Sequence, residues 1–137
     1  MDKIGKKCRD ISFRSDKNQS IVCVHSREAR EYARILEQDS NVITYEVCYA
    51  LELERYQFVN PLDIRKDYFT IEWTTDFVLY YMDGTIGIRE IITETSLTKR
   101  ATIEKLEFSR RYWSVSQAID WKIVIMEKLS LESKKQT

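Results

Sequence analysis

Apolar positions change their spacing along the chain, and each spacing predicts an element of secondary structure. The clearest helical spacing, i, i+3, i+4 and i+7, is that of Ala29, Tyr32, Ala33 and Leu36. It predicts a helix that Ser26 caps and that runs to about Gln38, with one face turned inward. A second helix is predicted from Thr102 to about Gln117. Its expected inward stripe consists of Ile103, Leu106, Arg110 and Trp113.

Runs of β-branched and aromatic residues predict strands at 21–24, at 42–53 and at 120–126. Residues 54–67 contain the only proline, Pro61, and two interpretations stay open for them. They form either a short helix or a long connection.

The strongest local signal is a predicted hairpin between Thr75 and Ile92. Two β-forming runs, Phe77–Tyr81 and Ile86–Ile92, flank Met82-Asp83-Gly84, which is typical of a hairpin turn. The predicted order is therefore β-α-β-(β)-β-β-α-β. This order favours an α/β fold with a mixed central sheet, a central β-hairpin and flanking helices.

Length and composition favour one globular domain. The chain has 137 residues, of which 43% are hydrophobic and 32% charged, a balance that excludes a wholly disordered chain. We expect a basic N-terminal arm at 1–17, a folded domain at 18–126 and a charged C-terminal tail at 127–137. No apolar run resembles a signal peptide or a membrane span, so we expect a cytoplasmic protein without a membrane partner.

The formal net charge is +0, from 22 basic and 22 acidic residues, so DNA affinity would require a local basic patch. Arg110 and Arg111 are candidates for contacts to DNA phosphates, and salt bridges on a helix surface are the alternative. His25 is the only histidine. Because no Cys/His cluster surrounds it in the sequence, we expect a capping or surface role rather than a zinc site.

Asp76 and Glu90, on the two strands of the predicted hairpin, are the candidate catalytic and metal-binding residues. Two carboxylates on neighbouring strands can hold one Mg²⁺ or Mn²⁺ ion through oxygen ligands, and such an ion promotes phosphodiester hydrolysis. The length of the turn determines whether Asp76 and Glu90 face each other across the hairpin. A two-residue turn would pair Asp76 with Ile91, whereas a three-residue loop with a left-handed Gly84 pairs Asp76 with Glu90.

The hairpin segment TDFVLYYMDGTIGIREII resembles the restriction-endonuclease-like, PD-(D/E)XK core. The next segment, TIEKLEFSRRYWSVSQAIDWKIV, is similar to the TnsA endonuclease subunit of heteromeric cut-and-paste transposons. Upstream, HSREAREYARILEQDSNVITYEV resembles the S-x-x-E helix, the turn and the following strand of the same family. The resemblance covers about Lys17 to Met126, and the RRYW helix is its most specific part.

The resemblance implies that Asp76 is the metal-binding aspartate and that Glu90 fills the acidic-or-Gln position beside it. Two residues of the family signature are replaced. The helical glutamate falls on Ala29 and the catalytic lysine on Ile92. The candidate replacements are Glu28, Glu31, Lys99 and Lys105. Because one residue turns a helix by about 100°, neither glutamate is expected in the site without a local shift.

The function that the resemblance implies is DNA transposition. A TnsA-like subunit is a magnesium-dependent endonuclease that cuts DNA at transposon ends, beside a TnsB-like transposase and a TnsC-like ATPase. A degenerate signature leaves activity uncertain here. The alternative is a pseudoenzyme, a catalytically inactive nuclease-fold subunit that binds DNA or protein.

Overall fold

The computed structural model describes residues 2, 3, 10–116 and 120–127, and it has a mixed α/β fold. A five-stranded sheet contains the path β1-β5-β6-β7, and its fifth strand, β4, also pairs with β5. Its strands are β1 (Asp2–Lys3), β4 (Val42–Ala50), β5 (Trp73–Tyr81), β6 (Ile86–Thr93) and β7 (Asp120–Met126). Among the described strands, only β6 and β7 pair in parallel, so the predicted mixed sheet with a central hairpin is confirmed.

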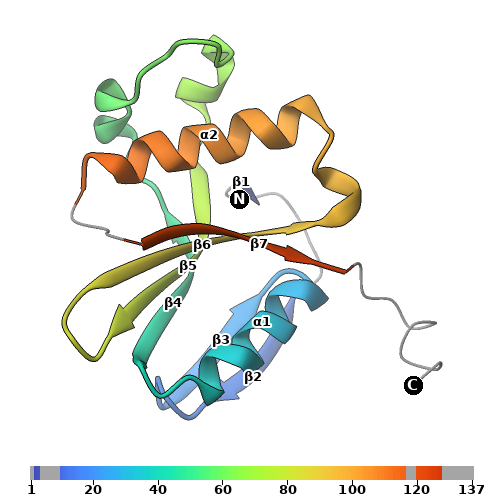
Figure 1. Cartoon of the computed structure of the whole chain (residues 1–137), viewed down its shortest axis with the longest axis vertical. Helices are drawn as coiled ribbons and strands as arrows, with labels where there is room; N and C mark the ends of the chain where they lie inside the picture. The colour runs from blue at the N-terminus through green and yellow to red at the C-terminus, as the bar shows by residue number, and fades with distance from the viewer. Residues whose placement is uncertain (1, 4–9, 117–119, 128–137) are drawn as a thin grey trace.

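The helices and a small second sheet cover the two faces of the large sheet (Figure 1). On one face lies α2 (Arg100–Ser114), with the 3-10 helices η1 (Leu53–Phe58) and η2 (Lys66–Thr70) beside it. A third 3-10 turn, η3 (Glu94–Ser96), connects β6 to α2. On the other face lie α1 (Arg27–Gln38) and the two-stranded sheet of β2 (Ile11–Ser15) and β3 (Ser20–Val24).

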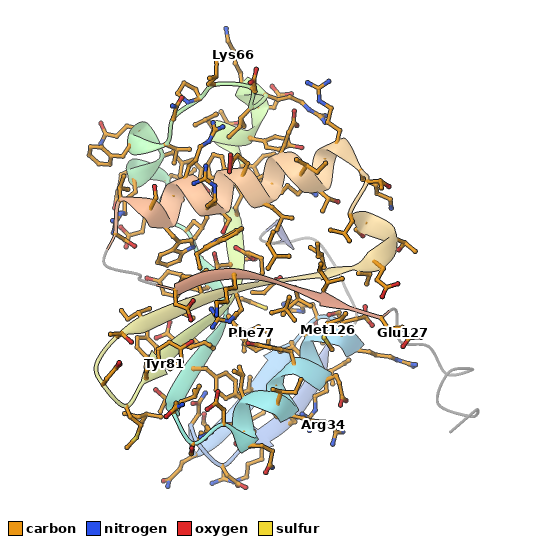
Figure 2. The ribbon with its side chains drawn as sticks, viewed as in Figure 1. Arg34, Lys66, Phe77, Tyr81, Met126 and Glu127 are labelled. Atoms are coloured by element: carbon orange, nitrogen blue, oxygen red, sulfur yellow. The ribbon has the colours of Figure 1, made fainter. Side chains whose placement is uncertain are left out.

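Two hydrophobic cores, one on each face, follow from alternation along β5. Phe77 and Leu79 pack with the apolar face of α1, and Figure 2 shows Phe77 and Tyr81 on that side. Val78 instead joins Trp73 and the aromatic residues of α2 in the second core. The inward face predicted for α1 and the Ser26 cap are confirmed, since the Ser26 hydroxyl accepts the N–H of Ala29 at 3.0 Å.

The described residues correct two predictions and decide one alternative that was left open. Ile11–Ser15, assigned to the N-terminal arm, is a strand paired with β3. The stripe predicted for α2 is rotated, because Ile103 and Arg110 are exposed while Phe108, Ser109 and Tyr112 are buried. The open segment 54–67 forms η1 and the start of η2. The predicted tail beyond residue 127 lies outside the described residues.

The start of β7 is held to the hairpin by an ion pair between a buried arginine and a half-buried aspartate. The Arg89 guanidinium on β6 lies 2.7 Å from the Asp120 carboxylate and also donates to the Tyr81 hydroxyl at 2.8 Å. The Tyr81 hydroxyl in turn donates to Asp120 at 3.1 Å. Gly87 makes room for this cluster, since a Cβ there would lie 2.6 Å from the Tyr81 oxygen.

We therefore expect Gly87→Ala to lower the free energy of unfolding by about 1–3 kcal/mol, as overpacking does in a well-packed interior. Urea denaturation of the wild-type chain and the variant measures the difference.

The Tyr81→Leu background is the control, because it removes the ring that the new methyl group would meet. The cost of Gly87→Ala should shrink there, with a coupling of about 0.5–3 kcal/mol between the two positions. Gly84→Ala is a second control: it meets no atom within 4 Å and is strained only by its φ of 85°, so its cost should not depend on residue 81. An equal cost of Gly87→Ala in both backgrounds would contradict the packing argument.

Candidate functional site

The β5–β6 register brings Asp76 and Glu90 to facing positions. The ladder pairs Tyr80 with Ile86 and runs to the pair of Phe77 and Arg89, so the next step sets Asp76 opposite Glu90. The loop is the three-residue Met82–Gly84 alternative: Gly84 has a φ of 85°, and its N–H donates to the Tyr81 carbonyl at 3.0 Å. The register that a shared cation requires is confirmed.

At this step the two strands separate, and carboxylates replace main-chain acceptors. The Asp76 N–H donates to Glu90 Oε1 at 3.1 Å, and the Ile91 N–H donates to Asp76 Oδ2 at 2.7 Å. In a continued antiparallel ladder, main-chain carbonyls would accept these bonds. Beyond the separation, β5 pairs instead with β1, at Trp73 and Thr74. The two carboxylates therefore connect β5 and β6 at the point where the strands separate, which we call the fork of the hairpin.

The sheet also changes its alternation at the fork. Phe77 faces the α1 core, but Thr75, two residues away, accepts a hydrogen bond from Trp113 of α2. The facing strand β4 changes in the same way at Cys48, whose φ of 49° is left-handed. Such a conformation is costly for a residue with a Cβ and is found most often where a site requires it.

Glu90 belongs to a buried polar network below α2, and its side chain has no exposed surface. Its Oε2 accepts a hydrogen bond from the Thr75 hydroxyl at 3.0 Å and another from the Ser109 hydroxyl. Trp121 Nε1 donates to the same Ser109 oxygen at 3.0 Å. These contacts connect β6 to β5, α2 and β7, so the Glu90 side chain stabilises the packing of these elements.

Burial raises the pKa of the Glu90 carboxyl above its usual range, because the charged form loses its hydration. The negative charge of Asp76 raises it further, whereas the hydrogen bonds from Ser109 and the Asp76 N–H act in the opposite direction. The protonated form is thus favoured in the folded state relative to the unfolded chain.

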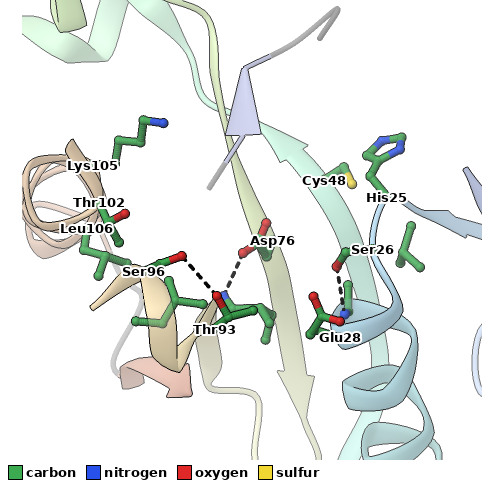
Figure 3. Close-up of a pocket in the computed structure, with 14 residues that line it drawn as sticks. His25, Ser26, Glu28, Cys48, Asp76, Thr93, Ser96, Thr102, Lys105 and Leu106 are labelled. Carbon is green, nitrogen blue, oxygen red and sulfur yellow. Dashed lines mark hydrogen bonds between the residues drawn. The ribbon is translucent and has the colours of Figure 1, made fainter. Parts of the chain in front are cut away.

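Asp76 lines a pocket of about 240 Å³ at the open end of the fork (Figure 3). Glu28, from the first turn of α1, and Lys105, from α2, line the same pocket. All three side chains are half-buried. The Lys105 ammonium lies 5.4 Å from the centre of the Trp73 ring. Two carboxylates and one amine from three separate elements therefore line this pocket, whereas Glu90 does not.

The two positions where the resemblance to TnsA places a glutamate and a lysine lie in the same place. Ala29 and Ile92 both line the pocket, next to the three charged side chains. We did not expect Glu28 here, because one residue turns a helix by about 100°. It reaches the pocket since the cavity extends around the N-terminal end of α1, where Ser26 also lines it. Glu31 and Lys99 are not among the lining residues, and Glu31 pairs with Arg34 at 3.5 Å.

Arg110 and Arg111 lie away from this pocket, in the second half of α2. Both form ion pairs with Glu107. Arg111 also donates to the carbonyls of Asn60 and Leu62, both at 2.7 Å, which fixes the segment after η1. The salt-bridge alternative is therefore present in the structure for both residues, and contacts to DNA stay a prediction.

His25 lies at the rim of the pocket, directly before the Ser26 cap. Its Nδ1 is 2.8 Å from Asp10 Oδ1 across the β2–β3 pair. Cys23 joins them, with the three donor atoms all within 4.8 Å of one another. The sequence did not predict this cluster, because Asp10 is fifteen residues before His25 and the strand β2 was not expected.

No protein-family model and no curated protein matches this chain.

None of the described helices has both the length and the apolar composition needed to cross a membrane.

The raised pKa of Glu90 predicts a pH-dependent stability. A carboxyl whose folded pKa lies above its unfolded value, near 4.5, contributes stability in full below that value. The contribution is lost as the pH rises through the folded pKa, with a slope of up to about 1.4 kcal/mol per pH unit. Glu90→Gln cannot titrate. Its free energy of unfolding, relative to wild type, should therefore increase as the pH rises from about 4.5 to about 7.

Urea denaturation across this pH range measures the difference between the two chains. Glu31→Gln, at an exposed glutamate, is the control for removing a carboxylate from the surface. A difference between Glu90→Gln and wild type that stays constant with pH would contradict the assignment.

Proposed function

We propose that this chain is a TnsA-like, metal-dependent DNA endonuclease subunit with a restriction-endonuclease-like core, and that its site is the Asp76 pocket. The observation that carries the proposal is that Asp76, Glu28 and Lys105 line one pocket at the fork of the hairpin. The family signature is replaced at Ala29 and Ile92, yet a carboxylate and an amine line the pocket from neighbouring positions.

The donor set fits a small divalent cation. Carboxylate oxygens are the ligands that Mg²⁺ and Mn²⁺ prefer, and Glu28 and Asp76 would supply them. When bound, the ion would polarise a phosphodiester and lower the pKa of an attacking water. The Lys105 ammonium would offset negative charge that develops on the phosphate. The fork holds Asp76 in place for this role, because the Ile91 N–H binds one of its carboxylate oxygens at 2.7 Å.

One observation favours a second function, a catalytically inactive nuclease-fold subunit that binds DNA or protein. Glu90, the second acid of the hairpin, is fully buried and accepts hydrogen bonds from two hydroxyl groups. Its raised pKa also opposes a charged ligand role. A site with only one hairpin carboxylate in the pocket could retain the shape of a nuclease without its activity.

The proposal includes the partners and the compartment that the resemblance implies. These are transposon-end DNA, a TnsB-like transposase and a TnsC-like ATPase, in the cytoplasm. Arg110 keeps an exposed guanidinium beside Glu107 and is the better placed of the two arginines for a phosphate contact, since Arg111 is bound to two carbonyls.

The first test is cleavage of supercoiled DNA by the full chain with Mg²⁺ or Mn²⁺. We expect Asp76→Asn to lower the rate of nicking by about 100-fold or more, because a bound cation contributes several kcal/mol to the transition state. The amide keeps an oxygen that can accept the Ile91 N–H, so the fork should survive. Gel electrophoresis of nicked and linear products gives the rate.

Calorimetric titration of Mn²⁺ separates the two functions. Wild-type chain that binds Mn²⁺ and loses this binding on Asp76→Asn supports a metal site in the pocket. Absence of both binding and nicking in the wild-type chain would exclude the enzyme and leave the inactive subunit.

A second test compares matched pairs of residues. Lys105→Ala and Glu28→Gln should each lower the nicking rate by about 10- to 100-fold, since a lost amine or ligand weakens the transition state without removing Asp76. The controls are Lys99→Ala and Glu31→Gln, which remove the same charges from outside the pocket. Equal effects of Lys105→Ala and Lys99→Ala would show that only the net charge matters, and this would contradict the assigned site.

A further inference from the structure

Three side chains of different chemistry lie close together at the open end of the β2–β3 pair. None of them is one of the three charged residues proposed for the Asp76 pocket. They are Asp10, Cys23 and His25, which offer a carboxylate oxygen, a sulfur and an imidazole nitrogen. One donor atom of each lies within 4.8 Å of the other two. In the described part of the chain, no other group of three His, Cys, Asp or Glu side chains has its donor atoms this close together.

Strand pairing explains why these residues converge. The register pairs Ile11 with Val24, so the next step sets Asp10 opposite His25. Cys23 is two residues before His25 on β3 and therefore points to the same face. Val24, between them, points into the α1 core. The three donors thus share the outer face of the β2–β3 pair.

We propose that Asp10, Cys23 and His25 form a zinc site. A thiolate and an imidazole together select Zn²⁺ over the hard cations Mg²⁺ and Ca²⁺, and a carboxylate is a common third ligand. Three protein ligands leave a fourth position for water or another group, as in zinc sites that are not purely structural.

The distances fit with small side-chain adjustments. Zinc–ligand bonds of about 2.0–2.3 Å in a tetrahedral site put ligand atoms about 3.3–3.8 Å apart. The Asp10–His25 contact of 2.8 Å is slightly shorter than this, and the upper bound of 4.8 Å for the group is about 1 Å longer. Asp10 is exposed, and Cys23 and His25 are half-buried, so their side chains have room to move.

A cation at this place would have a structural consequence for the neighbouring pocket. Asp10 precedes β2, while His25 connects β3 to α1 and lines the rim of the Asp76 pocket. Binding all three side chains would clamp β2 to β3 and fix the rim. The zinc site does not depend on the proposed nuclease function, because it uses none of Asp76, Glu28 and Lys105.

Titration with Co²⁺, a spectroscopic substitute for Zn²⁺, tests the site in the full-length, tag-free chain. We expect one equivalent of Co²⁺ to produce tetrahedral d–d bands and a thiolate-to-cobalt charge-transfer band, both removed by Zn²⁺. Cys23→Ser should abolish the charge-transfer band. His25→Ala and Asp10→Asn should each weaken binding at least about tenfold, since each removes a ligand of the cation. Zn²⁺ should also raise the melting temperature of wild type but not of Cys23→Ser.

The other two cysteines and the nuclease pocket provide matched controls. Cys48→Ser, Cys8→Ser and Asp76→Asn should all keep the charge-transfer band. Loss of the band on Cys48→Ser or Cys8→Ser with retention on Cys23→Ser would overturn the assignment. So would a wild-type chain that shows no charge-transfer band, which would leave Asp10 and His25 as a hydrogen-bonded pair at the surface. Circular dichroism of each variant confirms that it is folded before titration.

Discussion

The organisation of this protein depends on the exchange of hydrogen bonds at the fork of the β5–β6 hairpin. Glu90 accepts the N–H of Asp76, and Asp76 accepts the N–H of Ile91, at the point where the two main chains separate. Without these acceptors, two main-chain donors would be left unsatisfied in a half-buried place, at a cost of about 1–3 kcal/mol each. The separation in turn makes space for the pocket and admits β1 beside β5.

The same exchange gives the two carboxylates different environments. Glu90 is enclosed by α2, where hydroxyl donors compensate for the loss of hydration, and its pKa is raised. Asp76 remains half-buried at the pocket. A carboxylate buried without hydrogen bonds would cost several kcal/mol, so the network around Glu90 is a condition for the fold rather than an addition to it. The hairpin register alone therefore does not make the pair a metal site.

Local chemistry determined which features could be predicted. Gly84 after Met82-Asp83 allowed the correct three-residue loop, and the spacing of Ala29, Ala33 and Leu36 gave the face of α1. The burial of Glu90 could not be predicted, because it depends on how Ser109 of α2 packs over the sheet. The strand β2 had a period-2 signal in Ile11-Ser12-Phe13, but its basic surroundings favoured an arm. The Glu90 network and the donor cluster at His25 both depend on contacts between residues that are distant in the sequence, so neither could be predicted.

Under the proposed function, the position of the pocket also explains how the two replaced residues of the TnsA signature are compensated. Glu28 lies in the first turn of α1 and Lys105 in the second turn of α2, and the N-terminal ends of both helices flank the fork. Around the end of a helix, side chains from neighbouring positions reach a common space, whereas along its middle a step of one residue turns the side chain away by about 100°. Helix N-termini also carry partial positive charge, which favours a phosphate ligand between them. A site built from element ends therefore constrains the chemistry of its residues more strongly than their exact positions. Under the proposed function, Glu28 and Lys105 supply the acid and the amine that the resemblance places at Ala29 and Ile92.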